Sequence, residues 1–201
     1  MRREIIAPLS PEVARSLRAG DRVLLSGTIY TSRDAGHLRF VQAMDRGEEL
    51  PFPVEGSVIY YVGPTPAAPG QVIGSAGPTT SYRMDPYSPR LIRAGQLGMI
   101  GKGKRSPEVI EAMRKCGAVY FGAIGGAGAL LAKSIVASEV IAYEDLGAEA
   151  LRKLTVHQMP LLVVIDSLGN NLYETGPLQF KQQIQAEEAA QHGLDRELNN
   201  E

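Results

Sequence analysis

The sequence predicts a mixed α/β domain, or a layered β/β/α domain, because segments with strand-like and helix-like hydrophobic patterns alternate along the chain. Two stretches rich in β-branched and apolar residues, 22–30 and 57–62, are typical of strands. Ser10 and Ser106, each followed by proline, are typical helix starts, with serine as the N-cap. The order of these segments is too irregular to predict a doubly wound sheet.

The first half of the chain is predicted to alternate between helix and strand. A short helix follows Ser10, and strand 22–30 is followed by Thr31-Ser-Arg-Asp34, which caps a helix that continues to about Arg46. Strand 57–62 then leads into the glycine- and proline-rich stretch 63–70, which is predicted to be an irregular loop.

In the second half, a short apolar run at 97–104 ends in a basic glycine turn, and a helix runs from Ser106 to Lys115, ended by Gly117. The remaining expected elements, in chain order, are a strand at 118–123, an apolar helix from the glycines at 125–128 to about Ala137, an ordered segment at 139–143, a helix near 148–154 and an apolar segment at 161–165. We expect one catalytic domain over 1–178 and a polar tail, helical or frayed, over 179–201.

Composition excludes several classes of protein. The 201 residues carry a formal net charge of −1, so no basic surface for nucleic acid or an anionic membrane is expected. No apolar stretch approaches the roughly 20 residues of a membrane span, and the N-terminal residues lack the apolar core of a signal peptide. These features predict a cytoplasmic protein.

Metal-ligating residues are scarce. Cys116 is the one cysteine, so the chain cannot form an internal disulfide or hold an iron–sulfur cluster alone. The histidines, His37, His157 and His192, are far apart and in no ligand spacing. A metal, if used, should come from another chain.

The segment 74–85 carries the strongest functional pattern. Thr79 and Thr80 offer hydroxyl groups after a Gly-Pro turn, and Arg83 supplies a guanidinium that can pair bidentately with a carboxylate. The pattern predicts a site for a small anion. The alternative is a capped turn in which Arg83 pairs with a nearby acid.

Two further motifs could contribute cations. Arg33, Asp34 and His37 lie at a predicted helix start, where they could either cap the helix or clamp the second end of a dicarboxylate. Lys102 lies between two glycines in a spacing that does not match a phosphate loop, so it either reaches a small anion or belongs to a solvated turn. The glycines at 125–128 lack the dinucleotide fingerprint and favour close backbone packing or an anion at a helix N-terminus.

These motifs resemble the beta subunit of the iron–sulfur class I fumarases and L-tartrate dehydratases, equivalent to the C-terminal domain of single-chain members. The resemblance covers about Glu4 to Gly176 and rests on motifs at 20–27, 32–37, 77–84, 101–103 and 122–130. It implies a swivelling β/β/α fold, with mixed sheets layered with helices, and reversible hydration of fumarate to (S)-malate. It also implies a partner alpha subunit that holds a 4Fe–4S cluster in an alpha2beta2 assembly.

The resemblance also implies residue roles. Arg33, Arg83 and Lys102 would bind the carboxylates of the dicarboxylate substrate, and Thr79 would be the base that takes the C3 proton. Asp34, His37 and Thr80 would support them, the first two by orienting Arg33 or relaying protons. Because an ordinary threonine is far too weak a base, the site would have to stabilise its alkoxide.

Several alternatives stay open at this stage. Tyr82 lies where the family varies, so L(+)-tartrate or a related 2-hydroxy diacid could replace malate as the substrate. A regulatory or carboxylate-binding subunit without turnover would need the cations but not the threonine hydroxyl. An enzyme that works alone without a metal is disfavoured, since nothing else in the chain polarises a hydroxyl leaving group.

Overall fold

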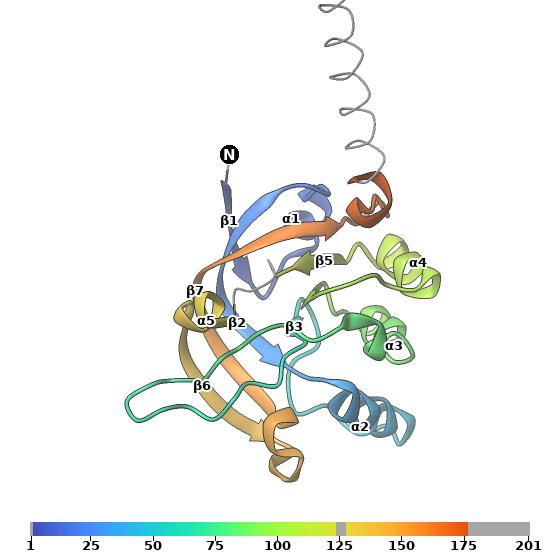
Figure 1. Cartoon of the computed structure of the whole chain (residues 1–201). Coiled ribbons are helices and arrows are strands. Elements are labelled where there is room, and N and C mark those ends of the chain that lie inside the picture. Colours follow the sequence, from blue (N-terminus) through green and yellow to red (C-terminus); the bar gives the residue numbers. More distant parts are fainter. Residues whose placement is uncertain (1, 124–127, 177–201) are drawn as a thin grey trace, which may run out of the picture.

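The computed structural model describes residues 2–123 and 128–176, whose strands form one seven-stranded sheet. The strand order is β1-β2-β3-β4-β5-β7-β6, and an additional pairing of β2 with β7 closes five of these strands into a small ring (Figure 1). The strands are β1 (Arg2–Ala7), β2 (Arg22–Thr31), β3 (Val58–Tyr60), β4 (Gly98–Gly101), β5 (Val119–Gly122), β6 (Ile135–Ala142) and β7 (Leu151–Ile165).

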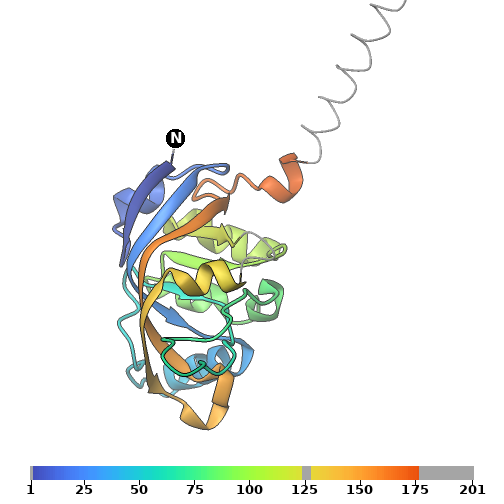
Figure 2. The same cartoon turned by 60° about the vertical axis from the view of Figure 1, so that its left-hand side comes forward.

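Strand direction divides the sheet into two parts. Pairings from β1 through β5 are parallel, so the carboxyl ends of β2, β3 and β4 lie at one edge of the sheet. The long strand β7 runs antiparallel to β2, β5 and β6. Figure 2 shows β2 and β7 curving around one side of the molecule.

Helices pack against the strands and contribute to both of their apolar cores. Figure 1 shows α2, α3 and α4 in a column on one side of the strands. The helical segments are α1 (Pro11–Ser16), α2 (Asp34–Asp45), α3 (Ser88–Arg93), α4 (Pro107–Cys116), α5 (Gly128–Lys133) and the 3-10 helices η1 (Ser81–Met84) and η2 (Glu144–Glu149). None of the helices within 2–123 and 128–176 is long and apolar enough to cross a membrane.

The central strands are buried on both faces and separate two apolar cores. Val58, Tyr60 and Phe121 belong to the core inside the ring. Their neighbours Ile59 and Tyr120 belong to the core between the strands and helices α2, α3 and α4. Such double burial explains why β3 and β5 are uninterrupted apolar runs in the sequence.

Most of the predicted elements are confirmed. The mixed α/β class and the strand at 22–30 are observed, and the strand predicted at 57–62 is present as the shorter β3. Ser10 and Ser106 accept hydrogen bonds from the backbones of α1 and α4. Gly117 ends α4 with a φ of 81° in the left-handed region, where glycine is favoured.

Two expectations about the fold are corrected. The helix predicted near 148–154 is wrong, because residues from Leu151 onward extend to pair with β2 and β6 in β7. The apolar helix predicted to reach Ala137 ends at Lys133, after which β-branched residues start β6. The described strands form one sheet that closes on itself into a small barrel-like ring. The predicted tail at 179–201 and Gly125 and Gly126 lie outside the described residues.

Candidate active site

The predicted site residues follow the carboxyl ends of three neighbouring parallel strands. Arg33 comes two residues after β2 and Lys102 directly after β4, while Thr79 bonds to Tyr61, the residue directly after β3. Ligands usually bind at the carboxyl ends of parallel strands, in open α/β sheets and in closed barrels alike. The order of the strands therefore collects residues that are far apart in the sequence.

The threonine segment is fixed between the ends of β3 and β4. The Thr79 N–H donates to the Tyr61 carbonyl at 2.8 Å, and the Ser81 N–H donates to the Lys102 carbonyl at 2.9 Å. Thr80 and Lys102 also form a parallel β-bridge. A side chain at Gly101 would overlap the Ser81 hydroxyl, so glycine is needed there for this close approach. Thr79, Thr80 and Lys102 are thus brought together.

A second group, the arginine cluster, consists of Arg33, Asp34, Arg83 and Glu149. Arg83 donates to the Asp34 carboxylate at 2.6 Å, and Arg33 Nη2 lies 3.3 Å from Glu149 Oε1. The four side chains are between 22% and 41% exposed, so solvent and ligands can reach the group. Arg83 links the cluster to Thr79 and Thr80, because it lies in η1, which directly follows these threonines.

This geometry shows which partners Asp34 and Arg83 bind in the free protein. The residue at the N-cap position of α2 is Arg33, and it makes no side-chain cap hydrogen bond. The Asp34 carboxylate, for which helix capping was one of two interpretations, accepts from Arg83. The ion pair foreseen in the alternative interpretation of Arg83 is therefore present, with Asp34 as the acid.

The arginine cluster has hydrogen-bonding capacity that the described residues do not use. Arg33 Nε, Asp34 Oδ1 and Glu149 Oε2 are buried and have no hydrogen-bond partner among the described residues. Buried polar atoms are normally paired, since an unmade hydrogen bond costs about 1–3 kcal/mol. The cluster therefore keeps hydrogen-bonding capacity that a ligand or water could take up.

His37 lies beneath the backbone of Arg33. Its Nδ1 is 2.9 Å from the Ser32 hydroxyl and 3.0 Å from the Arg33 carbonyl, and its ring packs edge-on against Tyr61. Burial lowers the pKa of His37 to about 3, so the imidazole is neutral near pH 7. A neutral histidine held in this way supports the start of α2.

Sequence reasoning missed Glu149 and a second polar group, the buried network of Asp85, Ser88, Arg105 and Tyr120. Arg105 lies over the rings of Tyr61 and Tyr120 and donates to Asp85 at 2.7 Å. Tyr120 in turn lies 2.9 Å from the Ser81 hydroxyl, directly below the threonine segment. Arg105 follows the Gly-Lys-Gly-Lys motif and Asp85 follows Arg83, but nothing local in the sequence indicates that they pair.

The chain's own donors do not fit an iron–sulfur cluster. The whole sequence contains one cysteine, Cys116, whereas a four-iron cluster takes several thiolates. Within the described ranges, no group of three or more His, Cys, Asp or Glu side chains could hold a metal ion. What the site does offer is two guanidinium groups, one lysine and two threonines, which suit a small dianion.

Comparison with known proteins supports the resemblance on which these roles rest. A family model described as "Fumarase C-terminus" matches residues 4–176. The aerobic class I fumarate hydratase of Escherichia coli K12 is 39% identical over 174 residues, 86% of this chain and 31% of that protein. Fumarate hydratase 2 of Leishmania major is 42% identical over 156 residues, 77% of this chain and 28% of that protein.

A shorter relative matches over most of its own length. The "Putative L(+)-tartrate dehydratase subunit beta" of Methanocaldococcus jannaschii is 37% identical over 172 residues, 83% of this chain and 88% of that protein. The chain therefore spans about a third of the fumarate hydratases it matches and most of this subunit. The match over 4–176 shows that the chain belongs to the Fumarase C-terminus family.

Proposed function

We propose that this chain is the beta subunit of a hydro-lyase that reversibly hydrates fumarate to (S)-malate. The observation that carries the proposal is that Thr79, Lys102 and the arginine cluster gather at one edge of the sheet, in a chain of the Fumarase C-terminus family. Arg33, Arg83 and Lys102 would bind the two substrate carboxylates, because guanidinium and ammonium groups in a half-buried site attract a dianion. We extend the proposal to the swivelling β/β/α class, a catalytic domain over 1–178 and a cytoplasmic location.

Thr79 would take the C3 proton. Its backbone N–H bonds to the Tyr61 carbonyl and the residue is half-buried, which holds Thr79 at the same edge of the sheet as the cations. The cations and the exclusion of water would stabilise the alkoxide form. Asp34, His37 and Thr80 would support the site, His37 by holding the backbone at Arg33.

The 4Fe–4S cluster would belong to a partner alpha subunit, in an alpha2beta2 assembly. Two observations support this part of the proposal: the chain has one cysteine, and a relative matched over 88% of its length is named "subunit beta". That relative also favours a second candidate function, L(+)-tartrate dehydration. Tartrate carries the same two carboxylates as malate and one more hydroxyl, so the same cations would bind it.

The first test is an anaerobic assay of malate and tartrate dehydration by the chain alone and with a cluster-loaded alpha subunit. We expect turnover in the mixture only, and the preferred substrate decides between the two candidates. In the Thr79→Ala variant, kcat should fall at least about 100-fold, since a positioned base contributes 10²–10⁴-fold, while KM stays within about threefold. Thr155→Ala, an exposed threonine on β7, is the matched control and should keep full activity.

Other outcomes would contradict the proposal at different points. A complex that forms but dehydrates neither acid would favour a binding or regulatory subunit. Equal losses of kcat and of substrate affinity in Thr79→Ala would count against its role as the base. Activity of the isolated chain would contradict the need for a partner.

A further inference from the structure

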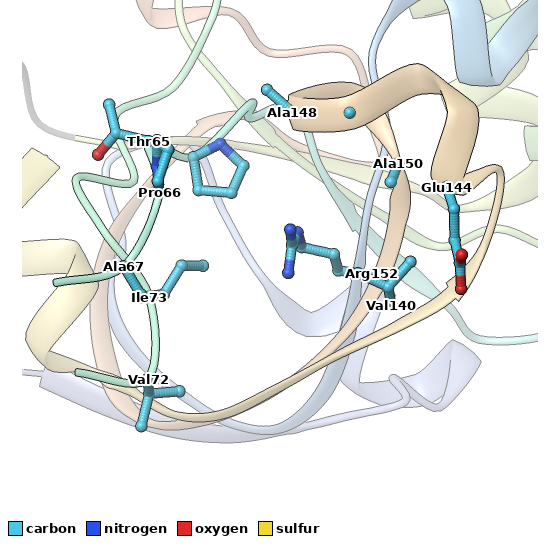
Figure 3. Close-up of a pocket in the computed structure, with 12 residues that line it drawn as sticks. Thr65, Pro66, Ala67, Val72, Ile73, Val140, Glu144, Ala148, Ala150 and Arg152 are labelled. Atoms are coloured by element: carbon cyan, nitrogen blue, oxygen red, sulfur yellow. The ribbon is translucent and has the colours of Figure 1, made fainter. Parts of the chain in front are cut away.

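A cavity of about 530 Å³ lies beside Glu149 and has no part in the proposed function. Its walls come from the loop at 64–73, from the η2 region at 144–150, and from β6 and β7 (Figure 3). Ala148 and Ala150, which flank Glu149, both line it. Sites for small molecules commonly occupy roughly 300–1,000 Å³, so the cavity is large enough for a compact ligand.

The cavity has apolar walls. Pro66, Val72 and Ile73 line the side formed by the loop, while Val140 and Ala150 line the opposite side. Figure 3 shows these two groups facing each other across the hollow. A ligand that fills the space would therefore bury an apolar body, and each Å² of apolar surface removed from water is worth about 25 cal/mol.

One cation projects into this apolar space. The Arg152 side chain extends from β7 into the middle of the hollow in Figure 3. Its Nε is buried and has no hydrogen-bond partner in the part of the chain that the structure describes. Its backbone is held in place, because its N–H donates to the Thr31 hydroxyl at 3.0 Å.

Glu144, the acidic residue in the cavity wall, does not pair with Arg152, so the Arg152 side chain can bind a ligand. Glu144, which also lines the cavity, is exposed and comes from η2 on the far side in Figure 3. No carboxylate of residues 2–123 or 128–176 lies within the 4.0 Å of an ion pair with Arg152. A half-buried guanidinium without a counter-ion favours an anionic ligand, most of all a carboxylate that can bind it bidentately.

We propose that this cavity binds a small organic monocarboxylate with a compact apolar body, its carboxylate paired with Arg152. A single cation in the apolar space matches one carboxylate, whereas the arginine cluster, with its two guanidinium groups, suits a dicarboxylate. The two sites would take different ligands although they are neighbours. Glu149 belongs to the arginine cluster, and Ala148 and Ala150 on either side of it line the cavity.

The test is a titration of the full chain with cyclohexanecarboxylate, followed by NMR of the arginine Nε–H groups and the backbone amides. We expect a saturable shift at Arg152 Nε–H and at the amides of 72–73 and 148–150. Acetate, which lacks the apolar body, and cyclohexanecarboxamide, which lacks the charge, should each bind at least tenfold more weakly. Equal binding of the amide, or shifts centred on Arg33 and Arg83, would overturn the proposal.

Variants test separately whether binding needs the charge of Arg152 and whether it needs the open space of the cavity. Arg152→Gln should weaken binding at least tenfold, while Lys153→Gln, which removes the same charge from the next and exposed position of β7, should change it less than twofold. Ala67→Leu alters an exposed wall position and should weaken binding at least tenfold without disturbing the core, so the proposal stays testable if Arg152→Gln does not fold. Unchanged binding in either Arg152→Gln or Ala67→Leu would overturn it.

Discussion

Two groups of charged residues lie at the same edge of the sheet and differ in how completely they are paired. In the buried network, the Arg105 side chain is 0% exposed, and its Nε, Nη1 and Nη2 all donate, chiefly to Asp85 and Ser88. In the arginine cluster, the Arg33 side chain is 22% exposed and its Nε has no hydrogen-bond partner among the described residues.

The difference separates a structural role from a binding role. A buried ion pair whose donors are all used has nothing left to offer a ligand, and removing one member leaves a buried charge behind. Rearranging the ion pairs of a half-exposed cluster costs little free energy of folding, because partly solvated pairs stabilise the fold only weakly. Charge alone would not have told these two arginines apart.

The largest expected effect is the loss of Arg105. In Arg105→Met, Asp85 would keep its charge in a nearly buried site without a cation, so the free energy of unfolding should fall by about 3–5 kcal/mol. Arg33→Met should lower it by less than about 1 kcal/mol, because its ion pair is partly solvated. Urea unfolding of both variants measures the contrast. Equal destabilisation by the two changes would contradict the division of roles.

His37 lies between the two groups, and its titration should be the next largest effect. Burial lowers its pKa to about 3 from an ordinary 6.5, so the unfolded chain takes up a proton more readily than the folded chain. The stabilising contribution is complete above about pH 6.5 and is lost as the pH falls toward 3. Between pH 7.5 and pH 5, the loss should be roughly 2 kcal/mol.

Unfolding measured across this pH range, in the parent chain and in His37→Gln, checks that expectation. The variant should lose the His37 contribution, and its stability should change by about 2 kcal/mol less between the same two pH values. His157→Gln, which removes an exposed histidine from β7, should behave like the parent. An unaltered acid response in His37→Gln would mean that His37 accepts a proton without disturbing the fold.

The sequence predicts the elements whose signals are local. Ser106 followed by proline and the later Gly117 define α4 at both ends, and the apolar residues of 57–62 indicate β3. The helix expected near 148–154 fails because β7 is specified by pairing with β2 and β6, and such pairing overrides local preference. β1, with charged residues at its start, owes its strand conformation to β2 in the same way.

The candidate site shows the same limit. Arg33, Thr79, Arg83 and Lys102 could be named because each belongs to a motif of neighbouring residues. Glu149 could not be named, since it meets Arg33 from a position 116 residues later in the chain, through the closure of the ring by β7. Pairing partners that only the topology brings together leave no local pattern. Glu149 is of this kind, whereas Asp34 could be named because it adjoins Arg33 in the sequence.

The smallest expected effect concerns Glu149, and it tests whether the arginine cluster exchanges partners. Glu149 lies within ion-pair distance of Arg33 without a well-oriented hydrogen bond, so a substrate carboxylate would compete with it for the guanidinium. In Glu149→Gln, one opposing negative charge is removed, which is worth about 1 kcal/mol in a half-exposed site. The KM of the assembled enzyme should fall about fivefold, and the free energy of unfolding should change by less than about 1 kcal/mol.

Glu144→Gln supplies the matched control, because it removes the same charge from the same 3-10 helix at an exposed position. Its KM should stay within about twofold of the parent value, which separates a contact with Arg33 from a general change in charge. A KM that rises tenfold in Glu149→Gln would mean that the carboxylate orients Arg33 for the substrate and does not compete with it. In that case Arg33 would need its partner as strictly as Arg105 does, and the distinction between the two groups would rest on exposure alone.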